Sequence, residues 1–98
     1  MITDTQLDEF RLKLDKVNRE YYESEMTIPD YFGGIEMKKG SKNAKYLITT
    51  GGSRSVLLFV DLQTGDILKA ATFTAPAKGS RGNIATTVPE HRTHWLYR

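Results

Sequence analysis

The sequence lacks cysteine altogether, and it has no long apolar run. Without cysteine the chain has no disulfide, no thiolate nucleophile and no cysteine-based zinc or iron–sulfur site, which fits a reducing compartment. Its longest uninterrupted apolar run, residues 56–60, is about a quarter of the length that spans a bilayer. The first residues are acidic and polar, so we expect no secretory signal, no membrane anchor and a cytoplasmic location.

The chain also lacks a strong net charge, because its 14 basic and 12 acidic side chains leave only +2. That small total hides an uneven distribution. Residues 1–35 hold four basic and eight acidic side chains, a net −4, whereas residues 36–98 hold ten basic and four acidic ones, a net +6. Such asymmetry suggests an anionic partner for the second half, although the two halves neutralising each other across the fold explains it equally well.

The first quarter of the chain has the pattern of an amphipathic helix, which we place at residues 3–26. Apolar residues recur three and four positions apart and form one stripe, consisting of Leu7, Phe10, Leu14, Val17 and Tyr21. Thr3 followed by Gln6 predicts a capping box at the start. We expect the stripe to pack on a sheet of the same chain, and the alternative is a coiled-coil seam that forms a homodimer.

The rest of the chain, residues 35–97, is predicted to form sheet and loops. Strand patterns occur at 35–39, 45–50, 54–62 and 66–74, and the third is apolar on both faces, as in a central strand. Residues 84–88 and 93–97 are each candidates for a last short strand. With 98 residues there is room for one core, so we predict a single α+β domain at 1–98. In it the helix packs on an antiparallel meander of three to five strands.

A basic, glycine-containing segment after Pro76 is the main candidate binding site. We interpret residues 77–83 as a loop in which glycines permit close approach of the backbone to a ligand, and cationic side chains contact phosphate. Its candidate residues are Lys78, Gly79, Arg81, Gly82 and Asn83. The four residues 79–82 also match the Gly-x-x-Gly pattern of a KH loop, but such a loop joins two helices. A basic loop that merely turns the chain is the alternative.

Two further cations complete the candidate site. Arg54 follows the Gly51-Gly52-Ser53 turn, and Lys69 lies in the strand before the basic segment. In a meander, the loops after the second and fourth strands lie at the same end of the sheet, which would let Arg54, Lys78 and Arg81 face one ligand. A solvated strand end is the other explanation for Arg54.

Metal binding and catalysis have little support in the sequence. His91 and His94 have a spacing that can hold a metal on a helix, but no third ligand lies nearby, so we expect no metal and no cofactor. The second half offers only Asp61, Asp66 and Glu90 as carboxylates, without a recognisable catalytic pair. We therefore expect a binding protein and not an enzyme. The aromatic tail at 91–98 either packs on the sheet or offers rings for base stacking.

One stretch carries a family resemblance. Residues 65–71 read Gly-Asp-Ile-Leu-Lys-Ala-Ala, residues 75–78 Ala-Pro-Ala-Lys, and residues 81–84 Arg-Gly-Asn-Ile. This pattern resembles a group of small uncharacterised proteins of tailed bacteriophages, over roughly residues 51–84 and not over the helix. The resemblance implies a phage origin and a place in the cytoplasm of the infected host cell. It implies no particular activity.

Two functions remain open at this point. The first is binding of nucleic acid or another phosphate-bearing ligand through a basic sheet and loop surface. The alternative is a phage-encoded inhibitor or adaptor that binds a host protein, in host takeover or against a host defence, which includes sequestration of a nucleotide signal. The small size and the amphipathic helix are compatible with the alternative.

Overall fold

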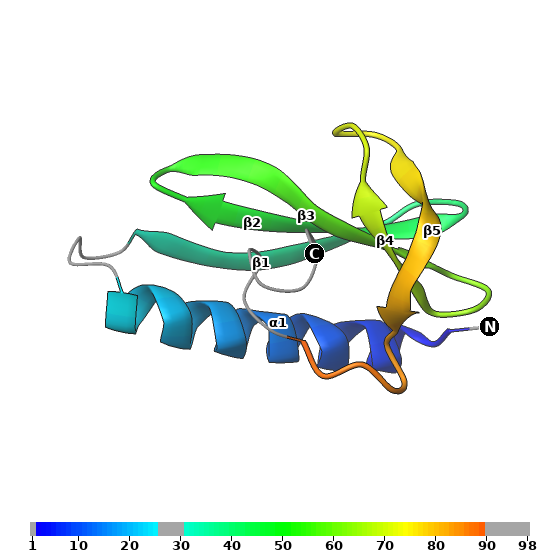
Figure 1. The fold of residues 1–98 in the computed structure, drawn as a ribbon, viewed down its shortest axis with the longest axis horizontal. Coiled ribbons are helices and arrows are strands. Elements are labelled where there is room, and N and C mark those ends of the chain that lie inside the picture. Colours follow the sequence, from blue (N-terminus) through cyan, green and yellow to red (C-terminus); the bar gives the residue numbers. More distant parts are fainter. Residues whose placement is uncertain (1, 26–30, 90–98) are drawn as a thin grey trace.

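One helix lies along one face of a five-stranded antiparallel sheet in the computed structural model, which describes residues 2–25 and 31–89 (Figure 1). The elements are α1 (Asp4–Glu25), β1 (Phe32–Lys39), β2 (Asn43–Thr50), β3 (Ser53–Asp61), β4 (Asp66–Ala70) and β5 (Pro76–Asn83). The order of strands in the sheet is their order in the chain, and each neighbouring pair is antiparallel. The predicted α+β meander is therefore confirmed, with the maximum number of strands expected.

Helix α1 begins where the sequence predicts. The Gln6 N–H donates to Thr3 Oγ1 at 3.1 Å, and the Thr3 N–H donates to Gln6 Oε1 at 2.9 Å, so the predicted capping box is formed. Of the apolar stripe, Leu7, Phe10 and Leu14 are buried against the sheet of the same chain. These positions are thus covered, and they are not free to form the coiled-coil seam considered as the alternative.

The main core lies between α1 and the sheet, with Tyr46 of β2 at its centre. This side chain is fully buried, and its ring meets that of Phe10 edge to face at 5.7 Å. Its hydroxyl donates to the Leu7 carbonyl oxygen at 2.6 Å. A buried hydroxyl without a partner would be costly, so this bond allows the polar end of the tyrosine to lie in the core. Burial disfavours the charged phenolate, and this effect is the main reason why the pKa of Tyr46 is raised above its ordinary value.

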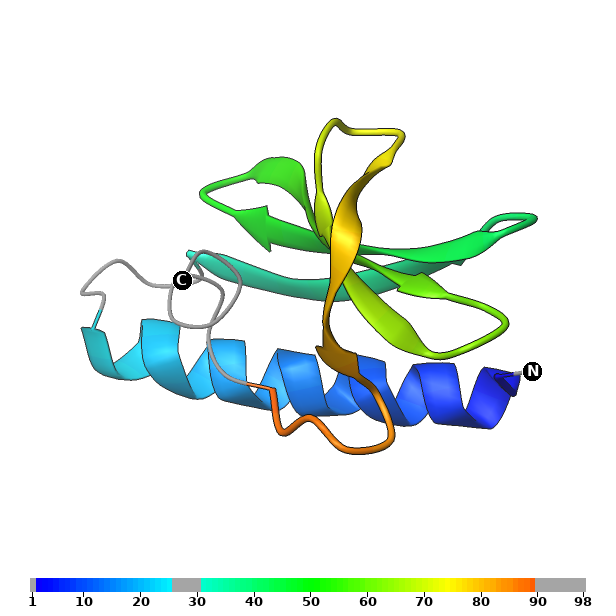
Figure 2. The same ribbon diagram turned by 45° about the vertical axis from the view of Figure 1, so that its right-hand side comes forward.

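A second, smaller apolar cluster lies on the sheet face that points away from α1, here called the outer face. Its buried members are Leu47, Val56 and Phe59, with Leu68 and Ala70 packed against them. The β4–β5 hairpin stands at a steep angle to β1–β3 in both views (Figures 1 and 2), as expected of a strongly twisted sheet. The sequence prediction of apolar residues on both faces of β3 is confirmed.

Strand boundaries differ from the prediction at both edges of the sheet. Strand β1 begins at Phe32, before the predicted residue 35, and the register shifts between Phe32 and Gly34. Residues 84–88 form turn and coil and not a strand, since the N–H groups of Thr86 and Thr87 donate to the Asn83 carbonyl oxygen. The candidate strand at 93–97 lies outside the described residues, as do His91 and His94.

Replacing Tyr46 with phenylalanine tests the central hydrogen bond. Tyr46→Phe keeps the ring contact with Phe10 but removes the hydroxyl, and we expect it to lower the free energy of unfolding by about 1 kcal/mol at neutral pH. The measurement is urea denaturation followed by circular dichroism. Tyr31→Phe makes the same change at a half-buried ring, and an equal loss there would refute a special role for Tyr46.

The same pair of variants predicts a pH dependence. The pKa of Tyr46 is raised in the folded state, so above the unfolded pKa of about 10 the unfolded chain releases a proton that the folded chain retains. Stability is therefore lost as the pH rises above 10, by up to about 1.4 kcal/mol per pH unit for this group. Denaturation midpoints at pH 9–11.5 should fall less steeply for Tyr46→Phe than for the wild type or Tyr31→Phe. Parallel curves would contradict the prediction.

Candidate anion-binding surface

The segment interpreted as a basic loop is a strand. Residues 77–83 belong to β5, which pairs with β4, and the chain turns earlier, at residues 71–75. The strand pattern at 66–74 therefore overestimates the fourth strand, since β4 ends at Ala70. Pro76 is the first residue of an edge strand, where the missing N–H removes no bond from the ladder.

The two glycines of this segment serve the shape of β5. The pairing of β4 with β5 is irregular at two places. Lys69 of β4 lies opposite three residues of β5, 77–79, and Ile67 lies opposite two, 81 and 82. Gly79 and Gly82 lie in these two irregularities with φ of 97° and 142°. Positive φ favours glycine, so the sequence pattern that suggested close approach to a ligand is explained by two β-bulges.

The cations of the predicted site do not converge. Ser80 lies opposite Leu68, which lies opposite Phe59, two residues before the end of β3. Lys78 and Arg81 lie within two residues of Ser80. Arg54 lies five residues before Phe59, about 16 Å away along β3. There its Nη2 contacts Glu36 Oε2 at 3.1 Å. Arg54 is thus a partly neutralised residue at the far end of the outer face.

The two other predicted site residues have different surroundings. The Asn83 side chain joins the β3–β4 turn to β5, since its Nδ2 donates to the Thr64 carbonyl oxygen at 2.8 Å and to Asp66 Oδ1 at 3.2 Å. Its Oδ1 accepts from the Ala85 N–H at 2.9 Å. These bonds give Asn83 a structural role. Lys69 is half-buried on β4, and Lys78 and Arg81 are exposed on β5.

The register brings together a different set of residues on the outer face. Reading across the sheet from β1 to β5, the residues directly opposite one another are Lys38, Lys45, Phe59, Leu68 and Ser80. Residues directly opposite in antiparallel strands share a face, so this row crosses the whole outer face. Four strand spacings make it about 19 Å long. Cations occupy its β1–β2 end and apolar side chains its middle, and Lys78 lies two residues before Ser80 at its β5 end. Arg81 and Gly82 instead lie opposite Ile67, a residue of the core on the α1 side.

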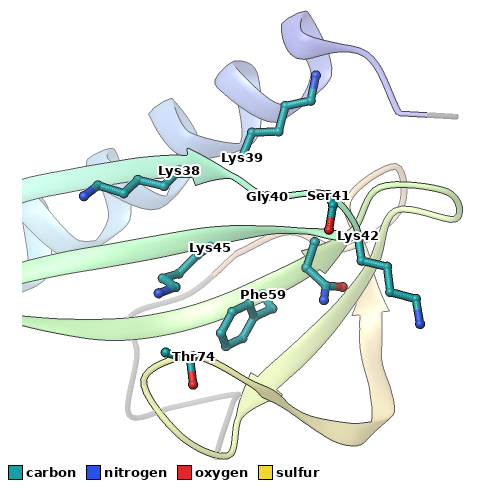
Figure 3. A pocket seen from close by; sticks show the side chains of 9 residues that line it. Lys38, Lys39, Gly40, Ser41, Lys42, Lys45, Phe59 and Thr74 are labelled. Carbon is teal, nitrogen blue, oxygen red and sulfur yellow. The ribbon is translucent and has the colours of Figure 1, made fainter.

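Three lysines form what we call the lysine cluster: Lys38, Lys42 and Lys45. Together with the β1–β2 turn, Phe59 and Thr74 they line a shallow depression of about 340 Å³ (Figure 3). The neighbouring Lys39 also borders it, but its ammonium points to the start of α1 and lies 2.7 Å from Asp4 Oδ1. None of the three cluster lysines forms an ion pair within residues 2–25 and 31–89.

The position of Lys45 calls for an explanation beyond solubility. Lysine on an edge strand protects the edge against pairing with another chain, and this accounts for Lys38 on β1. It does not account for Lys45, which is half-buried on the internal strand β2, directly opposite Lys38. Like charges directly opposite one another destabilise a sheet. An anion bound between the two lysines would remove that repulsion.

Carboxylates of the second half that were weighed as catalytic groups have turn contacts. Asp61 Oδ1 accepts from the N–H groups of Gln63 and Thr64, and Asp66 Oδ1 accepts from Asn83. No group of three or more potential metal-ligating side chains occurs in the described part of the chain. In that same part, no helix is long and apolar enough to cross a membrane.

The fold and this surface define a small α+β protein whose sheet carries a cationic outer face. Within that class, the chain belongs to a family of unknown function, DUF7717, whose model matches residues 5–97. The match covers nearly all of α1 and all five strands. No curated protein and no solved structure shows significant similarity to the chain.

Alanine at the two β5 glycines tests their structural role. A Cβ at Gly82 would collide with the Thr87 side chain, whereas a Cβ at Gly79 would meet nothing within 4 Å. Both positions have positive φ, which costs a residue with a side chain about 1–2 kcal/mol. We expect Gly82→Ala to lower the free energy of unfolding more than Gly79→Ala, as measured by thermal denaturation. Equal, negligible effects would show that the bulges do not need glycine.

Proposed function

We propose that this protein binds nucleic acid, or a similar phosphate-bearing ligand, through the outer face of its sheet. The observation that carries the proposal is the pair Lys38 and Lys45, which lie directly opposite each other beside a depression and without a carboxylate partner in the described residues. Phosphate oxygens are the complement of such a pair, because lysine ammonium groups bind them as mobile point charges.

The length of the outer face favours a polymer. The row from Lys38 to Ser80 is about 19 Å long, so only an extended ligand contacts both the lysine cluster and Lys78 of β5. Phe59 in the middle of the row is buried, and the half-buried Leu68 beside it offers an apolar contact for a base or sugar between successive phosphates. In this arrangement Lys78 remains a binding residue, but it contacts a different part of the ligand from the cluster. Arg81 lies opposite Ile67 and not on the outer-face row, so it is not among the residues of this proposed surface. Arg54, paired with Glu36, contributes least.

A binding role without catalysis is part of the proposal. The carboxylates Asp61 and Asp66 have hydrogen bonds that organise the β3–β4 turn, and the face that carries the cations has no acid–base pair among the described residues. The resemblance of residues 51–84 to tailed-bacteriophage proteins supports an origin in a phage and action in the host cytoplasm. The partner would then be phage or host nucleic acid.

Removing two lysines tests the surface. We expect Lys38→Ala/Lys45→Ala to weaken binding of a fluorescent oligonucleotide of about 10 nucleotides, measured by anisotropy at several salt concentrations. In a plot of the logarithm of the binding constant against the logarithm of the salt concentration, each contacted phosphate contributes about −0.7 to the slope. Loss of two such contacts in the double variant should therefore make the slope shallower by about 1.4. Lys78→Ala should also make the slope shallower, by about 0.7.

A charge-matched control separates this surface from general electrostatics. Lys13→Ala/Lys16→Ala removes the same charge from the exposed side of α1, on the opposite face of the molecule, and should leave the slope unchanged. If Lys13→Ala/Lys16→Ala changes the slope as much as Lys38→Ala/Lys45→Ala does, the outer face is not the site. If the wild type binds no oligonucleotide even at low salt, the proposal is wrong and the host-protein alternative takes its place.

A further inference from the structure

Phe73 is the most unusual side chain near the lysine cluster. It lies in the turn between β4 and β5, and 56% of its surface is exposed, although phenylalanine is normally a core residue. The next residue, Thr74, lines the same depression as Lys38 and Lys45. An exposed aromatic ring therefore stands at the border of the cationic surface.

The turn that carries Phe73 is well ordered by its own hydrogen bonds. Thr72 Oγ1 accepts from the N–H groups of Thr74 and Ala75, at 3.3 and 3.0 Å. In return the N–H groups of Ala71 and Thr72 donate to the Ala75 carbonyl oxygen, at 3.0 and 3.1 Å. Four bonds within five residues hold the backbone on both sides of Phe73. The ring is thus presented to solvent from a fixed position, which lowers the entropic cost of binding a partner.

One cation joins the ring to the proposed phosphate site. The Lys45 ammonium lies 4.3 Å from the centre of the Phe73 ring, within the range of a cation–π contact. Lys45 thus covers one part of the ring, and the exposed fraction shows that much of the rest faces solvent. A ligand phosphate at Lys38 and Lys45 would place the attached sugar and base next to Phe73.

We infer that Phe73 is a stacking platform for an unpaired base, so that the outer face selects single-stranded over double-stranded nucleic acid. In a duplex the flat faces of the bases are covered by their neighbours, and only phosphates and groove edges are accessible. Single-stranded segments expose those faces, and proteins that bind them combine a cationic path with aromatic rings. The inference rests on the proposed function, because the lysines must first hold the backbone.

The test compares ligands that have the same phosphates but differ in their bases. The probes are a fluorescent oligo(dT) of about 10 nucleotides, an abasic oligomer of the same length, and a duplex of that length. Stacking on an aromatic ring is worth about 5- to 150-fold in affinity per base, so the wild type should bind oligo(dT) more tightly than the abasic oligomer by a factor in this range. The duplex should bind no better than the abasic oligomer.

Substitutions of Phe73 complete the test. Phe73→Ala should reduce oligo(dT) affinity to that of the abasic oligomer while leaving the abasic affinity unchanged, and Phe73→Tyr should restore it. Leu12→Ala removes another exposed apolar side chain, 53% exposed on α1, and should change neither affinity. Thermal denaturation of each variant checks that it is folded.

Two results distinguish the inference from the proposed function. If the wild type binds oligo(dT), the abasic oligomer and the duplex alike, and Phe73→Ala changes nothing, the stacking role is overturned and the phosphate-binding surface stands. If none of the three probes binds, both are overturned.

Discussion

The contact of Tyr46 with the first half of α1 is the interaction on which the rest of the structure depends. The tyrosine lies on β2, next to the edge of the sheet, and it combines an edge-to-face contact with Phe10 and a hydrogen bond to the Leu7 carbonyl oxygen. Because residues alternate between faces, fixing Tyr46 toward the helix directs the preceding Lys45 to the outer face. The contact of Tyr46 with α1 thus also determines which side chains of β2 lie on the cationic surface.

The other half of α1 is held to β1 by different chemistry. Asp15 Oδ2 accepts from the Ile35 N–H at 3.2 Å, next to the irregularity between Phe32 and Gly34, and Asp15 Oδ1 also contacts Arg19. The Tyr22 ring stacks on Phe32 at 5.6 Å, with the Arg19 guanidinium 5.1 Å from the Phe32 ring. Helix and sheet are therefore joined at both ends, and the surface of β1 and β2 has a rigid support.

The sequence was sufficient to predict the helix and the meander, because these follow from local signals. Three- and four-residue spacing, the capping pair Thr3 and Gln6, and an apolar strand at β3 each depend on neighbours in the chain. Strand β5 could not be predicted in the same way. Pro76, Gly79 and Gly82 are typical of a loop, and only the pairing with β4 shows that they begin and bulge an edge strand.

The candidate site was predicted less well than the fold, for a related reason. Four lysines within residues 38–45 were visible as a signal, but that segment was interpreted only as the end of one strand, a turn and the start of the next. Which lysines share a face depends on register, and the shift between Tyr46 and Leu47 cannot be derived from composition. The expectation that Arg54 would meet Lys78 and Arg81 failed for another reason: it required residues 77–83 to be the loop after the fourth strand, and they form β5.

The two bulges of β5 also affect how readily this sheet can pair with a strand of another chain. An open sheet has two edges, and each is a template on which a foreign strand can grow. A strand that added to β5 would have to straighten the backbone at Gly79 and Gly82 and pass a proline at its start. At the opposite edge it would meet the shifted register at Gly34 and the charges of Lys38 and Lys39. The fold thus keeps its outer face available for ligands while both edges of the sheet discourage aggregation.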